Sequence, residues 1–146
     1  MKIRSLALAL LATALVVAGC SSAESKNEYV DTVNEIQGAA LKSANAVSDA
    51  ATGTDRQAAK AFGEAQEETD AAVAELNEID VPSEAQAGHE ELVAAFEALS
   101  GLLAMVREQV DKGQRVDARK VRTEETQIDK RIADAIDQIN SDLGAE

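Results

Sequence analysis

Apolar residues recur at three- and four-residue spacing through four stretches of this chain, and Gly53, Pro82 and Gly113 separate each stretch from the next. In an α-helix that spacing places the apolar side chains on one face, so each stretch predicts an amphipathic helix. We expect four helices, over about residues 26–52, 55–79, 84–112 and 115–143.

The connections between these helices are short, which favours antiparallel packing of consecutive helices. Composition also favours helices over strands, because the chain has one proline and aromatic residues make up only 2% of it. We therefore predict an all-α fold, an up-down-up-down four-helix bundle over 26–146, ~40 Å long at a rise of ~1.5 Å per residue. A long coiled-coil hairpin that dimerises is the alternative, since near-heptad spacing serves either arrangement.

Helix start and stop signals stand at the breaks between the stretches. Thr54 with Gln57, and Ser83 with Gln86, both fit a capping box, in which side chains satisfy the unpaired amides of the first helical turn. Gly113 suits a helix C-terminus, where a left-handed residue is favoured.

A different pattern opens the chain. Lys2 and Arg4 precede an uncharged run over 6–17, and small residues follow it before Cys20, the only cysteine. This order of charged, apolar and small residues is typical of a secretory signal. The apolar run has about 12 residues, whereas a helix needs ~20 to cross a bilayer, so we expect 1–19 to be a cleaved signal peptide.

The residues Val17-Ala18-Gly19-Cys20 resemble the lipobox of bacterial lipoproteins. The resemblance implies that Cys20 is diacylglycerated, that the signal is cut between Gly19 and Cys20, and that the new amino group is often acylated as well. Two or more acyl chains hold a protein firmly on a bilayer, whereas a single chain binds marginally. The resemblance covers 1–20 alone and implies a lipid-anchored protein on the extracytoplasmic face of the cell membrane. In composition the remainder resembles small bacterial lipoproteins with alanine-rich helical ectodomains, often of unassigned function.

Charged residues are unevenly distributed along the chain. Loss of Lys2 and Arg4 with the signal takes the net charge from −13 to −15. In an antiparallel bundle, the half next to the anchor holds 3 basic and 18 acidic residues, and the other half holds 9 of each. The anchored half comprises 20–38, 68–98 and 129–146. Residues 20–25, the lipidated cysteine and a short tether, keep this acidic half near the lipid. Two interpretations remain open: repulsion from anionic lipid keeps the bundle upright and soluble, or the acidic half receives a cationic partner or divalent ions.

A basic group lies in the other half, made up of Arg115, Arg119, Lys120 and Arg122. It is a candidate contact surface for an envelope protein or an anionic wall polymer. The simpler interpretation is a solvated helix face.

His89 is the only histidine and falls on the apolar face of the third predicted helix. One interpretation is a hydrogen-bonded boundary residue that reaches Tyr29, Asp31 or Glu75. The other is a ligand or divalent-metal site formed by His89, Asp31 and Glu75, or a contact that responds to pH.

Catalytic and cofactor motifs can be tested by counting residues. A di-iron carboxylate bundle needs two Glu-x-x-His motifs, and a c-type haem needs Cys-x-x-Cys-His, and the sequence has neither. His89 followed by two glutamates is not a zinc protease motif, because position 93 is valine rather than a second histidine. We expect Glu125, on the apolar face of the fourth helix, to pair with Arg107, Arg122 or a neighbouring helix at the boundary of the core rather than to act as a general acid. No enzyme activity and no cofactor are predicted, and the acidic charge disfavours nucleic acid as a partner.

The sequence therefore predicts a membrane-anchored extracytoplasmic lipoprotein that acts as a helical interaction module in the cell envelope. The alternative is a bundle that binds a small ligand or a divalent metal in its acidic, membrane-proximal half. In either case the acylated Cys20 would contact membrane lipid.

Overall fold

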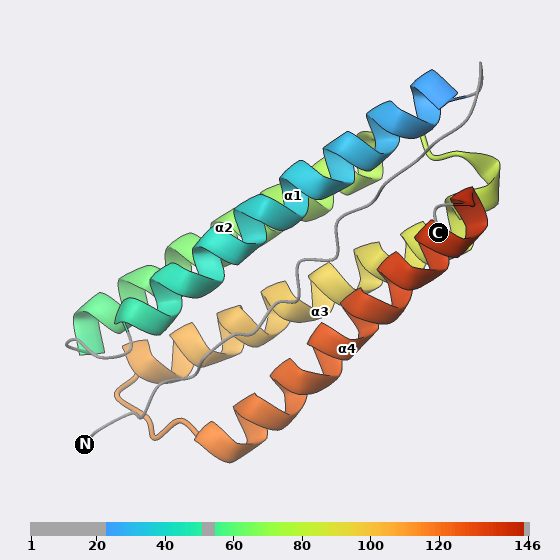
Figure 1. Cartoon of the computed structure of the whole chain (residues 1–146). Helices are drawn as coiled ribbons and strands as arrows, with labels where there is room; N and C mark the ends of the chain where they lie inside the picture. The colour runs from blue at the N-terminus through green and yellow to red at the C-terminus, as the bar shows by residue number, and fades with distance from the viewer. Residues whose placement is uncertain (1–22, 51–54, 145–146) are drawn as a thin grey trace.

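The computed structural model describes residues 23–50 and 55–144 of the chain. This described part is all-helical and contains no strand, which confirms the predicted all-α class. The elements are α1 (Ala23–Ala50), α2 (Asp55–Glu78), the short 3-10 helix η1 (Ser83–Ala85), α3 (Gln86–Asp111) and α4 (Ala118–Leu143) (Figure 1). The predicted signal peptide, lipobox and cleavage site between Gly19 and Cys20 lie outside the described residues, as does the predicted tether up to Ser22. The last three residues of that predicted tether, 23–25, instead begin α1.

Each helix packs against the one that follows it in the sequence: α1 against α2, α2 against α3, and α3 against α4. Consecutive helices run in opposite directions (Figure 1). The start of α1, the turn between α2 and α3, and the end of α4 therefore lie at one end, which we call the proximal end. The start of α2 and the connection from α3 to α4 lie at the other, the distal end.

The core draws its most buried side chains from all four α-helices. The largest of the fully buried side chains are Phe96, Leu76, Leu92, Ile136, Ile139, Val33 and Thr69. The polar member of this set, Thr69, donates its hydroxyl to the carbonyl of Ala65 over 2.7 Å, so its burial leaves no donor unpaired. Removing a leucine or isoleucine of this size from water contributes ~1.5–3 kcal/mol. Burial of one face from each amphipathic helix thus follows from the spacing of its apolar residues.

The third and fourth helices approach closely at Gly88. A Cβ atom built there would lie 2.8 Å from Cγ1 of Ile139 and 3.1 Å from the carbonyl oxygen of Ala135. No side chain larger than hydrogen fits without a shift of α4. This glycine is therefore a packing residue in the core of the described part.

The ends of the helices can be compared with the predicted start and stop residues. Gly113 has a φ of 63°, so the left-handed residue expected after the third helix is confirmed. The capping box predicted from Ser83 and Gln86 is wrong. Ser83 instead begins η1, where the amide of Ala85 donates to the carbonyl of Pro82 over 2.9 Å, and α3 begins without a side-chain cap. The Thr54 capping box lies outside the described residues.

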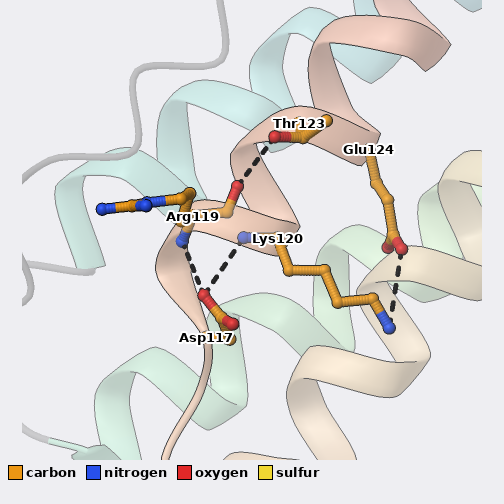
Figure 2. A network of polar contacts seen from close by, with 5 residues as sticks. All are labelled: Asp117, Arg119, Lys120, Thr123 and Glu124. Carbon is orange, nitrogen blue, oxygen red and sulfur yellow. Dashed lines mark hydrogen bonds and ion pairs between the residues drawn. The ribbon is translucent and has the colours of Figure 1, made fainter.

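The fourth helix begins at Ala118, three residues later than the predicted 115. Its N-cap is Asp117, whose carboxylate accepts hydrogen bonds from the amides of Arg119 at 3.0 Å and Lys120 at 3.2 Å (Figure 2). An aspartate in this position satisfies two amides that have no partner within the helix. The cap therefore sets the start of α4.

None of the helices in the described ranges has the length and apolar character needed to cross a membrane.

Candidate functional site

His89 lies on α3 at the proximal end and is only 5% exposed. Its Nδ1 is 3.3 Å from the hydroxyl of Tyr29 on α1, and the two ring centroids are 5.8 Å apart. The backbone of Leu76 on α2 acts on the pKa of the same imidazole. Among the predicted candidates, Tyr29 is therefore the hydrogen-bond partner of His89.

Burial lowers the pKa of His89 below its ordinary value of 6.5, although the backbone of Leu76 and the charge of Glu90 act in the opposite direction. The imidazole is therefore neutral at pH 7. Burial likewise raises the pKa of the Tyr29 hydroxyl, so the pair is uncharged throughout the physiological range. A neutral imidazole has one nitrogen that accepts a hydrogen bond, so Nδ1 can accept from the tyrosine hydroxyl.

A pocket of about 390 Å³ opens beside His89, between the end of α2 and the start of α3. Its lining residues are Leu76, Asn77, Ile79, Asp80, Val81, Gln86, His89, Glu90 and Val93. The apolar members are buried or half-buried, whereas the two carboxylates are exposed. The pocket therefore presents a mainly polar surface with two acidic groups that face solvent, and none of its lining residues in the described part is a lysine or arginine.

The predicted metal set is not assembled. Asp31 and Glu75 are both exposed, and neither lines the pocket that His89 borders. Among the described residues, no three side chains of histidine, cysteine, aspartate or glutamate come together in a group that could hold a metal ion. The acids beside His89 are Asp80 and Glu90, which the sequence reasoning missed. They are ten positions apart, and only the turn at Pro82 brings them to one pocket.

The three basic residues of the acidic half are all in ion pairs. Lys26 of α1 pairs with Glu84 of η1 at 3.1 Å, and Arg131 of α4 pairs with Glu91 of α3 at 2.7 Å. The third, Lys130, pairs with Asp134 at 2.5 Å within α4. Most of the acids in this half therefore have no cation beside them.

The predicted basic group lies at the distal end, on the connection before α4 and on its first turns. All four of its residues, Arg115, Arg119, Lys120 and Arg122, are exposed. Lys120 pairs with Glu124 at 3.7 Å, as Figure 2 shows. Within the described part of the chain no ion pair forms at the three arginines.

Arg56 extends this basic group. It lies in the first turn of α2, is exposed, and also has no ion pair within the ranges that the structure describes. The start of α2 lies at the distal end together with the start of α4 (Figure 1). Sequence reasoning missed this residue because 59 positions separate it from Arg115. We call Arg56, Arg115, Arg119 and Arg122 the distal arginines.

Glu125 is 4% exposed on α4. The expected pairing with Arg107 is wrong, because Arg107 pairs with Asp111 at 3.8 Å and its guanidinium packs against Gly63 of α2. Arg122 forms no salt bridge with it either, so Oε1 of Glu125 has no hydrogen-bond partner among the described residues. Burial and then the charge of Asp129 raise the pKa of Glu125 to about 7, and the charge of Arg122 opposes the rise. Burial also raises the pKa of Asp129.

Comparisons of this chain with protein-family models, with curated proteins and with solved structures give no match.

Proposed function

We propose that this protein is a lipid-anchored interaction module of the cell envelope, held to the membrane by the acylated Cys20 and docking an anionic partner at its distal end. The four helices then form an up-down-up-down four-helix bundle on the extracytoplasmic face of the membrane. The partner is an envelope protein or an anionic wall polymer, and the module carries out no reaction of its own.

The observation that carries the proposal is the position of the unpaired arginines. Every other basic residue whose side chain the structure describes is in an ion pair, whereas the distal arginines are exposed and form no ion pair with the described residues. A guanidinium presents its donors in a planar fork that fits carboxylate and phosphate groups. Several of them at one end therefore suit a partner that carries repeated anionic groups.

At the start of α4, such a partner would bind to side chains rather than to the backbone amides. Asp117 already accepts hydrogen bonds from two amides at the start of the helix (Figure 2). The carboxylate also repels an anion that approaches those amides. Binding at this end would consequently depend on guanidinium groups and would weaken as salt is added.

A charge reversal in intact cells tests the proposal. We would replace Arg115 and Arg119 with glutamate and crosslink the protein to its neighbours with a zero-length carboxyl-to-amine reagent and a photoreactive one in parallel. Acidic residues near a helix N-terminus are favourable, so the double variant should remain folded. The expected result is that the crosslinked species made by the native protein disappears.

The matched control is Lys60→Glu with Lys130→Glu, which changes the net charge by the same amount. Both lysines are exposed and pair within their own helices, with Glu64 at 2.8 Å and with Asp134. This control should keep the crosslink. Loss of the crosslink in both double variants, or in neither, would contradict docking at the distal arginines.

A further inference from the structure

We infer that the partner of the distal arginines is a linear polymer of repeating phosphodiester groups, which runs across the starts of α2 and α4. The inference rests on the proposed docking function and names the partner of that same surface. It selects one of the two partner classes, because the distal end lacks the features that a folded protein partner needs.

The distal end offers no apolar anchor for a folded protein. Specific protein interfaces place aromatic and aliphatic side chains in a core that excludes water, and a few of these side chains carry most of the affinity. Along residues 56–62 and 111–122 no aromatic or large aliphatic side chain is exposed: Phe62 and Val116 are half-buried, and Val121 is buried. The exposed residues of these segments have charged, amide or small side chains. A partner that binds here would therefore gain its affinity from charge.

The acids near the distal arginines are already engaged. Three of them pair with basic residues: Glu108 with Lys112, Asp111 with Arg107 at 3.8 Å, and Glu124 with Lys120 at 3.7 Å. Asp117 accepts hydrogen bonds from two amides of α4. Figure 2 shows the guanidinium of Arg119 pointing away from the helix and from both carboxylates drawn beside it. The distal arginines therefore have no carboxylate partner within the described ranges.

The distal arginines are spread over two helices rather than gathered around one point. Arg56 is on α2, whereas Arg119 and Arg122 are on α4. In the described part of the chain, α2 and α4 both pack against α3 and do not pack closely against each other. Along α4, the rise from Arg119 to Arg122 is ~4.5 Å. A small anion would reach only some of these groups, whereas a linear polyanion meets several, and each further contact forms within one complex.

The chemistry of the free cations favours phosphodiesters. The lysines near this end, Lys60, Lys112 and Lys120, are all paired, and the cations that remain are arginines. A phosphodiester has two free oxygens that accept both arms of a guanidinium fork. Its charge lies in the polymer backbone, where bond rotation lets successive phosphates follow arginines on two helices. A uronic acid chain instead holds its carboxylates on rigid rings.

Binding of a defined polymer tests the inference. The full lipoprotein in nanodiscs of zwitterionic lipid would be titrated into a fluorescently labelled decamer of glycerol phosphate, with Kd measured by anisotropy and empty nanodiscs as the blank. We expect saturable binding in 50 mM salt, weakened ~20–50-fold in 200 mM salt if three or four phosphates are contacted. Unlabelled diethyl phosphate or polygalacturonate, at equal charge concentration, should displace the decamer at least tenfold less well than unlabelled decamer.

A charge reversal locates the contact on α4. Arg115→Glu with Arg119→Glu should weaken decamer binding at least tenfold. The matched control is Lys60→Glu with Lys130→Glu, which changes the net charge equally at lysines that are already paired, and should leave Kd within twofold of the native value.

Two further variants test the span and the geometry of recognition. Arg56→Glu should weaken decamer binding at least threefold, because the polymer also contacts α2. Arg119→Lys with Arg122→Lys keeps the charge and removes the guanidinium fork, and should also weaken binding at least threefold.

Each contrary outcome overturns the inference. Absence of saturable decamer binding, or equal displacement by polygalacturonate, refutes a phosphodiester partner. Unchanged binding by Arg56→Glu refutes a partner that runs across both helices, and unchanged binding by the lysine variant refutes recognition by guanidinium forks. A crosslink in cells that needs Arg115 and Arg119, without decamer binding, keeps the docking function and makes the partner a protein. Decamer binding with a crosslink that the same variant leaves unchanged contradicts docking at this surface in the cell.

Discussion

Replacing the buried Glu125 with glutamine should change how the stability of this protein depends on pH. The side chain is 4% exposed, and its Oε1 has no hydrogen-bond partner in the described part of the chain. A charged carboxylate is disfavoured in such surroundings, and the nearby charge of Asp129 disfavours it further. A glutamine of the same shape cannot ionise, so it avoids that cost at every pH.

The size of the effect follows from the pKa, which rises from 4.5 to about 7 in the folded protein. At ~1.36 kcal/mol per pKa unit this corresponds to ~3 kcal/mol of differential stability. The carboxyl of the unfolded chain, with its ordinary pKa of 4.5, is already half ionised at pH 4.5, so a comparison that starts from this pH captures ~2–3 kcal/mol of the difference.

The sign is set by which state holds the proton. Between pH 4.5 and about 7 the folded protein binds a proton at Glu125 that the unfolded chain has released. Stability therefore falls as pH rises through this window, and is at its full value below it. The stability of the glutamine variant relative to the native protein should therefore be greater above pH 7 than at pH 4.5.

Urea unfolding at pH 4.5, 6 and 8 measures the difference, because groups that titrate in both proteins cancel when the two curves are subtracted. The difference in unfolding free energy should shift by ~2–3 kcal/mol in favour of the variant between pH 4.5 and 8. Glu124→Gln is the control, because the carboxylate of Glu124 is half-buried and pairs with Lys120; the curve of this variant should run parallel to that of the native protein. Parallel curves for Glu125→Gln as well would refute the reasoning.

Three further predictions concern packing, the His89 hydrogen bond and the anchor. Gly88→Ala should lower the unfolding free energy by ~1–3 kcal/mol in urea titrations, because its Cβ would lie 2.8 Å from a side-chain carbon of α4, whereas Gly101→Ala, which meets nothing within 4 Å, should not. Tyr29→Phe removes the hydroxyl that His89 accepts and should cost ~1–2 kcal/mol, measured in the same way, with a downfield or upfield change in the imidazole proton shifts as a local readout. Cys20→Ala should release the protein from the membrane fraction and remove the acyl mass seen by intact mass spectrometry; retention of both would contradict the anchor.

The sequence predicted the helices well because their signals are local. Spacing of apolar residues and the glycine at 113 depend only on near neighbours, so four helices and the left-handed stop could be anticipated. The helix starts were harder. Ser83 and Gln86 fit the capping pattern, yet the 3-10 hydrogen bond to Pro82 satisfies the first amide instead. The spacing of apolar residues could not show that Asp117 would be the N-cap of α4, which places the start of the helix at Ala118 rather than at 115.

The candidate sites depended on contacts between helices, which spacing within one helix does not report. Tyr29 was one of several possible partners for His89, and only the placement of the start of α1 beside the start of α3 selects it. Asp80 and Glu90 meet at one pocket because the turn after α2 reverses the chain. Arg107 was a reasonable partner for Glu125 by its position in the sequence. Its guanidinium, however, lies against Gly63 of α2, whereas Glu125 is on α4.

The separation of charge along the helices has a consequence for what the distal arginines can reach. If Cys20 is lipidated as proposed, the proximal end lies at the bilayer, and helices of 24 to 28 residues carry the distal arginines ~36–42 Å away at ~1.5 Å per residue. Electrostatic attraction is screened over ~8 Å at physiological ionic strength, so anionic lipid would exert almost no pull on guanidinium groups at that distance. Arginines at the proximal end would instead bind the lipid headgroups themselves. Of the three basic residues in the acidic half, Lys26 near the proximal end and Lys130 and Arg131 midway along α4 are all in ion pairs. An acidic proximal end and a basic distal end thus leave the arginines available to an anionic partner beyond the membrane surface.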